Sequence, residues 1–328
     1  MRVLITGGAG FIGSHIADKL VARGDRVLIL DDLSTGRREN IEHLLDSDRV
    51  ELVEGSVVDE ALVEQLMCTV DACFHLASAV GVKLVVNQPL DSVLDSVRGT
   101  DVVASVAVRR KVRLLFTSTS EIYGKNGSGP LHEDSDRLLG PATTARWSYS
   151  TAKAFGEILA HGYAHEHGAE TVVARLFNTV GPRQTGAYGM VLPTFVRQAL
   201  SGEDLTVYGN GTQTRCFTHV YDSVDALTSL MDTDAAIGNV FNIGCGNEVR
   251  IAKLARIVLE RTGSDSRIRL VPYEEAYGDG FDELSRRVPD CSALNRLIGW
   301  TPRRTVTDAV DDVIAYQREA LSEVPVGV

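Results

Sequence analysis

The chain has 328 residues, 44% of them hydrophobic and 23% charged, which is enough to bury a substantial core in one large domain or two packed ones. Its formal net charge of −11 argues against nucleic acid or an anionic membrane surface as a partner, because both require a basic footprint. A negatively charged substrate would therefore need arginines placed at its own site.

The five cysteines form no C-x-x-C pair, and no histidine lies at metal-ligand spacing from them. This pattern indicates free thiols in a reducing compartment and no metal site. The first residues, "MRVLITGG", form a strand that enters a glycine turn, without the basic and apolar stretches of a leader peptide. No apolar stretch is long enough to span a membrane, so we expect a cytoplasmic protein.

Short apolar runs alternate with segments of helical periodicity in the first half of the chain. Strands are predicted over 2–6, 26–30, 50–54, 72–77, 113–118 and 171–177. Helices are predicted over 13–23, 60–66, 92–110 and 150–167. This alternation predicts an α/β protein with a doubly wound parallel sheet of the Rossmann type, covered by helices on both faces.

The alternation weakens after about residue 178, where glycine and proline cluster in "GPRQTGAYGMVLP" and "YGNGTQTR". We expect residues 1–177 to form the sheet domain and residues 178–328 a smaller substrate-binding lobe, with part of 215–245 packing back on the sheet. Ligands of such folds bind at the carboxyl ends of the strands. The site should therefore lie between the two lobes.

The segment "TGGAGFIGSH" places Gly7, Gly10 and Gly13 between the first predicted strand and the first predicted helix. Glycines at this spacing allow a tight turn and a close approach of a pyrophosphate to the helix N-terminus. Asp31 ends the second strand, where a carboxylate binds ribose hydroxyls and repels a 2′-phosphate, which favours NAD over NADP. The next segment, "DDLSTG", adds three predicted contacts to the adenosine half: Asp32, Ser34 and Gly36.

Tyr149 and Lys153 are four residues apart, so they share one face of a predicted helix. A nearby ammonium favours the phenolate and should lower the pKa of Tyr149 from about 10 toward the working range. Such a tyrosine can take a proton from an alcohol while a nicotinamide accepts the hydride. Three hydroxyls at the end of the preceding strand are candidates to hold the same alcohol oxygen: Ser118, Thr119 and Ser120.

These motifs, together with "HLAS" (75–78), "TSTSEIYG" (117–124), "RLFNTVGPR" (175–183) and "YGNGTQTRCFTHVYD" (208–222), resemble the extended short-chain dehydrogenases/reductases. More narrowly, the chain is similar to nucleotide-sugar epimerases, dehydratases and decarboxylases. The resemblance runs nearly end to end and includes "RRVPD" (286–290) and "LIGWTP" (297–302). The motifs are specific for the superfamily and only weakly specific for the product.

The resemblance implies NAD bound after the glycine turn and at the following strand ends, by Phe11, Ile12, Asp31, Ser56, Val57, Leu76, Ala77, Ser78, Ser118, Tyr149 and Lys153. It implies a UDP-sugar whose diphosphate is held by Asn178, Arg215 and Arg287, with Arg183 less favoured. Further substrate contacts are implied for Thr179, Met190, Val191, Leu192, Val207 and Tyr208. Two positions depart from the family pattern. Ser56 stands where the family often has Asp, and Ser96 and Arg98 replace a common Asn-x-x-Gly-Thr pattern.

Other residues are expected to be structural. His75 and His219 are expected to be buried and hydrogen-bonded rather than catalytic, and Tyr123, beside Gly124, is expected to pack. The helices over 92–110 and 150–167 carry apolar faces beyond what a sheet contact needs. In the family that the chain resembles, these helices form a dimer interface, so we expect a homodimer.

The resemblance implies that the reaction begins with oxidation of the sugar at C4. A 4-epimerase then needs no further acid or base, whereas dehydratases and decarboxylases do. Glu121 in "TSTSEIYG" stands where dehydratases keep a base and UDP-glucuronate decarboxylases keep an acid. Thymidine-linked dehydratases have Asp at the position of Ser120, so a GDP-linked dehydratase fits better than a thymidine-linked one.

The segments "RWSYSTAK", "CFTHVYDS" and "YGDGFDELSRRVPD" are similar to bacterial UDP-glucuronate decarboxylase domains, which favours a UDP-hexuronate substrate. Decarboxylases, however, carry an arginine about where Met190 stands, and this loop is more similar to that of an epimerase. We therefore expect an NAD-dependent 4-epimerase that converts UDP-glucuronate to UDP-galacturonate, with Tyr149 as acid and base.

In such an epimerase Thr119, Ser120 and Thr179 would hold the sugar carboxylate, and Glu121 would lie outside the direct chemistry. The first alternative is a UDP-glucuronate decarboxylase that uses Glu121, and a GDP-sugar 4,6-dehydratase is less favoured. A non-catalytic NAD(P)-sensing or RNA-binding protein is a further alternative. The intact Tyr149–Lys153 pair and the acidic charge argue against it.

Overall fold

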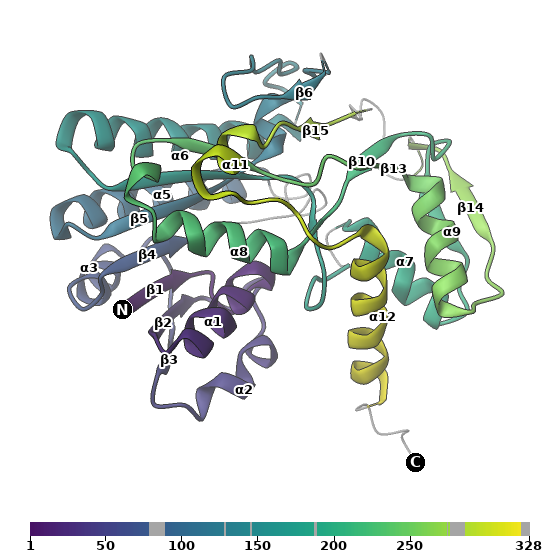
Figure 1. The fold of residues 1–328 in the computed structure, drawn as a ribbon, viewed down its shortest axis with the longest axis horizontal. Coiled ribbons are helices and arrows are strands. Elements are labelled where there is room, and N and C mark those ends of the chain that lie inside the picture. Colours follow the sequence, from purple (N-terminus) through teal and green to yellow (C-terminus); the bar gives the residue numbers. More distant parts are fainter. Residues whose placement is uncertain are drawn as a thin grey trace.

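The computed structural model describes residues 1–78, 89–127, 129–144, 146–186, 189–273, 275 and 286–322. A seven-stranded sheet lies at its centre, in the order β12-β7-β5-β4-β1-β2-β3, with every neighbouring pair parallel (Figure 1). The strands are β1 (Arg2–Thr6), β2 (Arg26–Asp31), β3 (Val50–Glu54), β4 (Ala72–His75), β5 (Arg113–Thr119), β7 (Thr171–Leu176) and β12 (Val240–Ile243). This confirms the predicted doubly wound α/β fold.

Both faces of the sheet are buried except at the edge strand β3, which explains why strands such as β1 and β2 are continuous apolar runs rather than alternating ones. In β1, Val3 and Ile5 belong to one core cluster and Leu4 to another, because successive side chains of a strand point to opposite faces. The six predicted strands are present. β12 was not predicted as a strand, although it lies in the segment expected to pack back on the sheet.

Helices cover the two faces as the sequence predicts, with bounds slightly longer than expected. One face carries α1 (Phe11–Arg23), α8 (Val220–Met231) and α11 (Ser292–Ile298). The other carries α3 (Glu60–Met67), α5 (Pro89–Arg110) and α6 (Arg146–His167). α1 begins directly after the glycine turn and ends at Gly24, whose φ of +94° is the left-handed conformation that commonly terminates helices.

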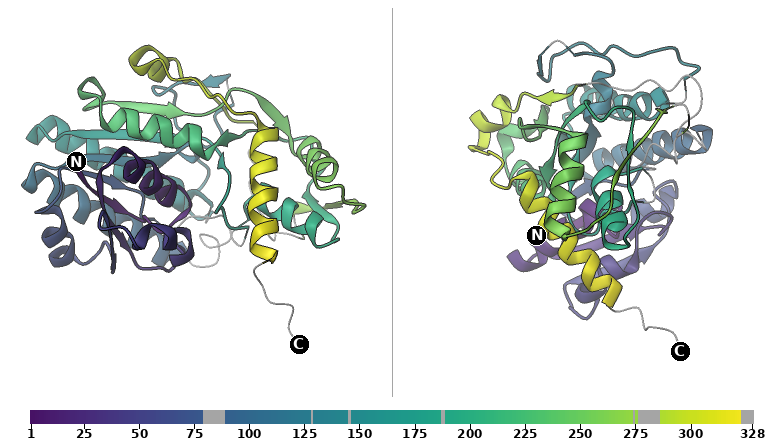
Figure 2. Two further views of the ribbon diagram at one scale, coloured as in Figure 1. Left: turned by 60° about the horizontal axis from the view of Figure 1, so that its bottom comes forward. Right: turned by 90° about the vertical axis from the view of Figure 1, so that its right-hand side faces the viewer.

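A second core forms the smaller lobe, to one side of the sheet (Figures 1 and 2). Its elements are α7 (Val191–Leu200), α9 (Ile251–Thr262), α12 (Val306–Ser322), β9 (Leu205–Tyr208) and β14 (Ile268–Val271). Short strands lie between the lobes or beside them: β6 (Pro130–Leu131), β8 (Thr179–Val180), β10 (Thr214–Cys216), β11 (Thr218–His219), β13 (Glu248–Arg250) and β15 (Val288–Pro289). The remaining helices within the described residues are α2 (Glu42–Leu45), η1 (Arg38–Asn40), η2 (Ser120–Tyr123) and η3 (Asp234–Ala236).

The chain crosses between the lobes more often than a division at residue 177 implies. α8, β12 and α11 lie beyond that boundary and pack with the sheet, so the two-domain boundary of the sequence analysis stays an interpretation. α5 and α6 contact each other and expose four apolar side chains, Leu90, Leu94, Phe155 and Ile158. These side chains fit the homodimer expected from the sequence, which stays a prediction. No helix in the described part of the chain combines the length and apolarity needed to cross a membrane.

Asp222 of α8 fixes the chain as it enters α12. Its carboxylate, 1% exposed, accepts hydrogen bonds from the backbone N–H groups of Arg303 and Arg304 at 3.0 and 2.9 Å. The Arg304 guanidinium donates a third at 2.7 Å. A buried carboxylate with these three donors holds the smaller lobe's last helix to the sheet domain.

We expect Asp222→Ala to lower the free energy of unfolding by about 2 kcal/mol, because it removes the buried acceptor of three hydrogen bonds, one of them from a guanidinium. Denaturant unfolding measures the change. Asp225→Ala is the matched control on the same helix, since its carboxylate is half-exposed and pairs with Lys19. The control should lose at most about 1 kcal/mol. Equal losses for both variants would contradict the anchoring role of Asp222.

Candidate active site

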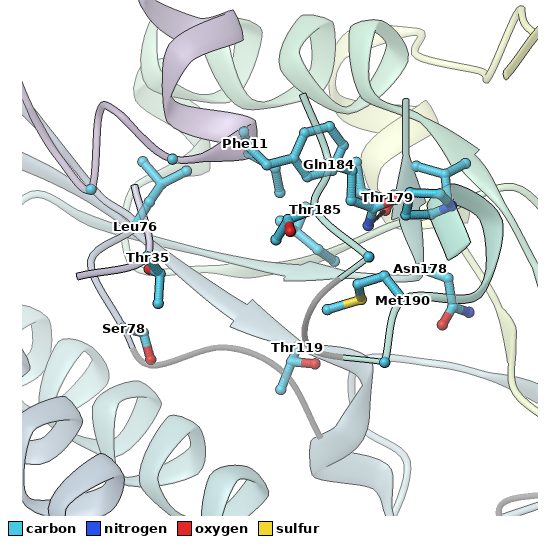
Figure 3. Close-up of a pocket in the computed structure, with 18 of the residues that line it drawn as sticks. Phe11, Thr35, Leu76, Ser78, Thr119, Asn178, Thr179, Gln184, Thr185 and Met190 are labelled. Carbon is cyan, nitrogen blue, oxygen red and sulfur yellow. Dashed lines mark hydrogen bonds between the residues drawn. The ribbon is translucent and has the colours of Figure 1, made fainter. Parts of the chain in front are cut away.

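A cavity of about 1620 Å³ lies between the carboxyl edge of the sheet and the smaller lobe. Figure 3 shows side chains from both sides of it, with Phe11, Leu76 and Thr119 from the sheet domain and Thr185 and Met190 from the following segment. Sites for one drug-sized ligand measure roughly 300–1,000 Å³, so this cavity has room for a dinucleotide and a second ligand.

The cavity brings together all but one of the predicted site residues. Its lining includes Gly7, Gly10, Phe11, Ile12, Gly13, Asp31, Asp32, Ser34, Gly36, Ser56, Val57, Leu76, Ala77, Ser78, Ser118, Thr119, Ser120, Glu121, Tyr149, Lys153, Asn178, Thr179, Met190, Val191, Leu192, Tyr208, Arg215 and Arg287. Their contacts with ligands remain predictions.

Val207 is the exception, and its predicted substrate contact is wrong for this structure. Its side chain is fully buried in the core of the smaller lobe. Residues alternate between the two faces of β9, so Thr206 and Tyr208 face the cavity and Val207 faces away.

The glycine turn forms a cradle that side chains would fill. Gly7 has a φ of +73°, and a Cβ atom at Gly13 would lie 2.3 Å from the Gly7 carbonyl oxygen. The first turn of α1 can therefore pack this closely on the β1–α1 turn only with glycine at position 13. The N-terminus of α1 is left facing the cavity, as a pyrophosphate requires.

Asp31 lies at the far end of the same cavity. Its two carboxylate oxygens accept hydrogen bonds from the backbone N–H groups of Ala9 and Leu33, each at 2.9 Å. Burial raises the pKa of Asp31, and these N–H groups act in the opposite direction. The carboxylate is held in place and keeps lone pairs for the hydroxyls of a ribose.

Two serine hydroxyls at the cavity wall help to decide whether the site can hold a cofactor. The Ser118 hydroxyl, at the end of β5, is buried in the cavity wall and has no hydrogen-bond partner, so a bound ligand would satisfy it. The Ser96 hydroxyl lies 3.1 Å from that of Ser78, which gives the unusual serine at position 96 a partner at the cavity wall. Together with the glycine cradle and Asp31, these groups fit NAD.

Lys153 lies one helical turn after Tyr149 on α6, and groups of β5 hold its ammonium in place. Its ammonium donates to the Thr117 carbonyl oxygen at 3.0 Å and lies 5.0 Å from the centre of the Phe116 ring. Burial lowers the pKa of Lys153 to about 8, with Glu157 acting in the opposite direction. The group therefore remains mainly cationic at neutral pH.

The predicted lowering of the Tyr149 pKa is wrong for this structure. Burial raises the pKa of Tyr149 above its ordinary value, and the Glu121 carboxylate raises it further. A hydrogen bond to Thr119 acts in the opposite direction but is outweighed. The pKa of Tyr149 therefore depends on the charge of Glu121.

Glu121 and Ser120 share an arginine from the other end of the chain. Arg287, 5% exposed, places Nη1 2.6 Å from Glu121 Oε1 and donates to Ser120 Oγ at 3.2 Å. The Nε atom of Arg287 is buried in the cavity wall without a partner. The expected diphosphate contact of Arg287 stays a prediction, but these contacts put its guanidinium beside Glu121.

The segment between the lobes contributes a residue that the sequence analysis missed. Gln184 follows "GPR" and donates from Nε2 to the Thr179 carbonyl oxygen at 3.0 Å, while its Oε1 is buried without a partner. Asn178, which directly precedes Thr179 in the chain, has a φ of +32°, an uncommon conformation that occurs at functional sites. The position of Gln184 just after "GPR" was the feature of the sequence that could have indicated a site residue. Other cavity residues that were missed include Thr35, Thr185, Gln213 and Tyr273.

Three residues outside the chemistry have structural partners. His75 is hydrogen-bonded at both ring nitrogens, to the hydroxyls of Thr6 at 2.7 Å and Thr100 at 3.2 Å, which confirms its expected structural role. His219 pairs with Asp312 at 3.1 Å and is likewise buried. Arg183 forms an ion pair with Asp18 at 2.7 Å and does not line the cavity. Among the described residues no cluster of metal-ligating side chains is found.

The chain belongs to the NAD dependent epimerase/dehydratase family, whose model matches residues 3–244. It is 39% identical to a UDP-N-acetyl-alpha-D-glucosaminuronate decarboxylase of Bacillus cytotoxicus, over 97% of this chain and 98% of that protein. It is 36% identical to UDP-glucuronic acid decarboxylase 1 of Xenopus tropicalis, over 98% of this chain and 73% of that protein. The structure is similar to a dTDP-glucose 4,6-dehydratase of Streptomyces venezuelae solved with NAD bound, with a TM-score of 0.89 and 29% identity, covering 98% of each chain. The protein is thus an NAD-dependent enzyme of nucleotide-sugar metabolism.

We expect Gly13→Ala to lose tightly bound NAD, because its Cβ atom would overlap the Gly7 carbonyl oxygen. The nucleotide content of the purified protein measures this. Gly162→Ala is the matched control, since a Cβ atom there meets nothing within 4 Å. Full NAD retention by a folded Gly13→Ala protein would contradict the assignment of the cradle.

We expect Glu121→Gln to shift the pH dependence of oxidation of a UDP-sugar that carries no carboxylate, such as UDP-glucose. Tyr149 must be deprotonated to act as a base, so oxidation rises as pH increases through its pKa. Removing the Glu121 charge removes one cause that raises this pKa, so the rise should move to lower pH. Thr119→Val should move it to higher pH. Near-ultraviolet absorbance of the reduced cofactor in single turnovers measures both, and shifts of the opposite sign would contradict the coupling.

Proposed function

We propose that the protein is a UDP-hexuronate decarboxylase, which releases the C6 carboxylate of the sugar as CO₂ and leaves a UDP-pentose. The carrying observation is the buried Arg287 beside Glu121 and Ser120, next to Tyr149. The two decarboxylases at 39% and 36% identity support the same function.

This proposal replaces the 4-epimerase that the sequence analysis placed first. That preference depended on Met190, which stands where decarboxylases were expected to carry an arginine. Arg287 supplies a guanidinium to the same cavity from a different segment, and the proposal assigns it to the sugar carboxylate instead of the diphosphate expected from the sequence. The absence of an arginine at position 190 therefore no longer argues against decarboxylation.

The sheet domain would carry out the first oxidation. In the proposed mechanism Tyr149 removes the proton from the C4 hydroxyl, and Thr119 orients Tyr149 through their hydrogen bond. Lys153, whose ammonium is held by the Thr117 carbonyl oxygen, would stabilise the Tyr149 phenolate by its positive charge. When bound, NAD supplies the acceptor of the C4 hydride and later its donor.

The C4 ketone makes loss of the carboxylate feasible, because the electrons of the breaking C5–C6 bond move onto the ketone oxygen. A carboxylate on Arg287 would be held by a charge-assisted pair through the free Nε atom. C5 would then lie between the C4 oxygen at Tyr149 and the carboxylate at Arg287, within reach of Glu121. Glu121 is the candidate acid that protonates C5 after CO₂ leaves.

The smaller lobe would hold the nucleotide. Arg215 lines the cavity on β10, with Nη1 donating to the Thr214 carbonyl oxygen at 2.7 Å. Its guanidinium is a candidate for the diphosphate, and Leu192 and Tyr208 are candidates for contacts with uridine. Locally placed arginines allow a protein of net charge −11 to bind a dianionic diphosphate.

The test is incubation of the purified enzyme with UDP-glucuronate and, separately, with its 2-acetamido analogue. We expect CO₂ release and a UDP-pentose by mass spectrometry. Arg287→Gln should reduce this turnover by roughly 100-fold or more. Arg286→Gln is the matched control, because its side chain is 40% exposed and pairs with Glu248, and it should retain turnover.

An unchanged mass with a new UDP-galacturonate peak would instead assign the enzyme as a 4-epimerase. Equal turnover by Arg287→Gln and Arg286→Gln would contradict the role of Arg287 even if CO₂ is released.

A further inference from the structure

The proposed reaction consumes a proton, and the structure bears on where that proton enters. Replacement of the C5–C6 bond by a C5–H bond converts a carboxylate and one proton into CO₂ and a C–H group. A 4-epimerisation consumes none. The site of a decarboxylase must therefore obtain one proton per turnover, either when substrate binds or after CO₂ leaves.

Before a sugar binds, Arg287 already compensates a negative charge. Its Nη1 atom lies 2.6 Å from Glu121 Oε1, and the pair is largely buried, with side-chain exposures of 5% and 20%. The guanidinium still has an unused buried donor, Nε, in the cavity wall. A second carboxylate can thus reach Arg287 while Glu121 is still beside it.

We infer that binding of a hexuronate at Arg287 makes Glu121 take up a proton from solvent, so that the proton consumed in decarboxylation enters with the substrate. This inference rests on the proposed function. It makes Glu121 neutral before C4 is oxidised and identifies it as the proton store for C5.

Two carboxylates that share one buried site do not both remain ionised, because the second negative charge is repelled at short range in a medium of low dielectric constant. The arriving carboxylate is fixed to the sugar and bonded to Arg287. Glu121 loses part of its compensation, so it is the group that accepts the proton.

Three other ionisable groups whose contacts are described do not remove this repulsion. On α6, the Tyr149 hydroxyl is neutral until it acts as a base, and Lys153 is committed to the Thr117 carbonyl oxygen. Arg137 contacts the Ile122 carbonyl oxygen of η2 at 3.3 Å, but it is exposed and screened by solvent.

Protonation of Glu121 also assists the first step. The Glu121 charge is one of the causes that hold the Tyr149 proton in place. A carboxylate-bearing sugar would therefore prepare both the base for C4 and the acid for C5 as it binds. A sugar without a carboxylate would prepare neither.

The test measures proton uptake on binding by the NAD-containing Tyr149→Phe enzyme, which should bind the sugar but not turn it over. Isothermal titration in buffers of different ionisation enthalpy gives the number of protons taken up. We expect about one proton per site for UDP-glucuronate near neutral pH. We expect none for UDP-glucose, and none for UDP-glucuronate with the Tyr149→Phe, Glu121→Gln double variant, which should still bind.

Binding of UDP-glucuronate without proton uptake would overturn the inference, as would equal uptake by the double variant. CO₂ release by the wild-type enzyme decides the proposed function separately. Release of CO₂ without uptake on binding overturns only the present inference, whereas uptake on binding with epimerisation and no CO₂ overturns only the proposed function. Absence of UDP-glucuronate binding overturns both.

Discussion

Seven strands that run in the same direction end at one edge of the sheet, and the chemistry of this protein depends on that constraint. The glycine turn follows β1, Asp31 ends β2, Ser78 follows β4, and Thr119 ends β5. These residues are far apart in the chain, yet they line one cavity. The dinucleotide site and the hydroxyl-rich end of β5 therefore need no long loops to meet, and their relative positions are set by backbone hydrogen bonds within the sheet.

The second half of the site depends on electrostatics rather than on strand register. Arg287 lies 167 residues from Ser120 in the chain and reaches η2 from beside the short strand β15. A guanidinium this deeply buried is stable only with an anionic partner, and Glu121 provides one. Under the proposed function the same guanidinium also holds the carboxylate of the sugar through its free Nε atom. One buried arginine would thus contribute both to folding of the ligand-free protein and to selection of a carboxylate-bearing ligand.

The sequence was sufficient for features that depend on local patterns. Continuous apolar runs located β1, β2 and β5, and glycine spacing located the cofactor turn. The sequence was not sufficient for features that depend on how distant segments pack. Val207 was predicted to contact the substrate from its position in the family motif, but the alternation of side chains along β9 directs it into the core of the smaller lobe.

Burial and neighbouring charge explain the other differences. The lowering of the Tyr149 pKa by Lys153 was predicted from helical spacing alone. The burial of Tyr149 and its closeness to the Glu121 charge, which raise this pKa, both result from tertiary packing. The partner of Arg287 could not be read from the sequence either, because no local pattern links residues so far apart. The free donors of Ser118 and Arg287 become evident only when every buried hydrogen bond is counted.

The repeated crossing of the chain between the two lobes has a mechanical consequence. The chain passes from one lobe to the other at residues 178–180, 217–219, 244–248 and 300–305, and two of these passages run side by side as β8 and β11. Two bodies joined by one linker can swing open, but two bodies joined at several places, with two passages paired as strands, resist rotation about any single axis. We therefore expect ligand exchange to rely on local rearrangement at the mouth of the cavity, with a nearly constant distance between the oxidising half and the nucleotide-binding half.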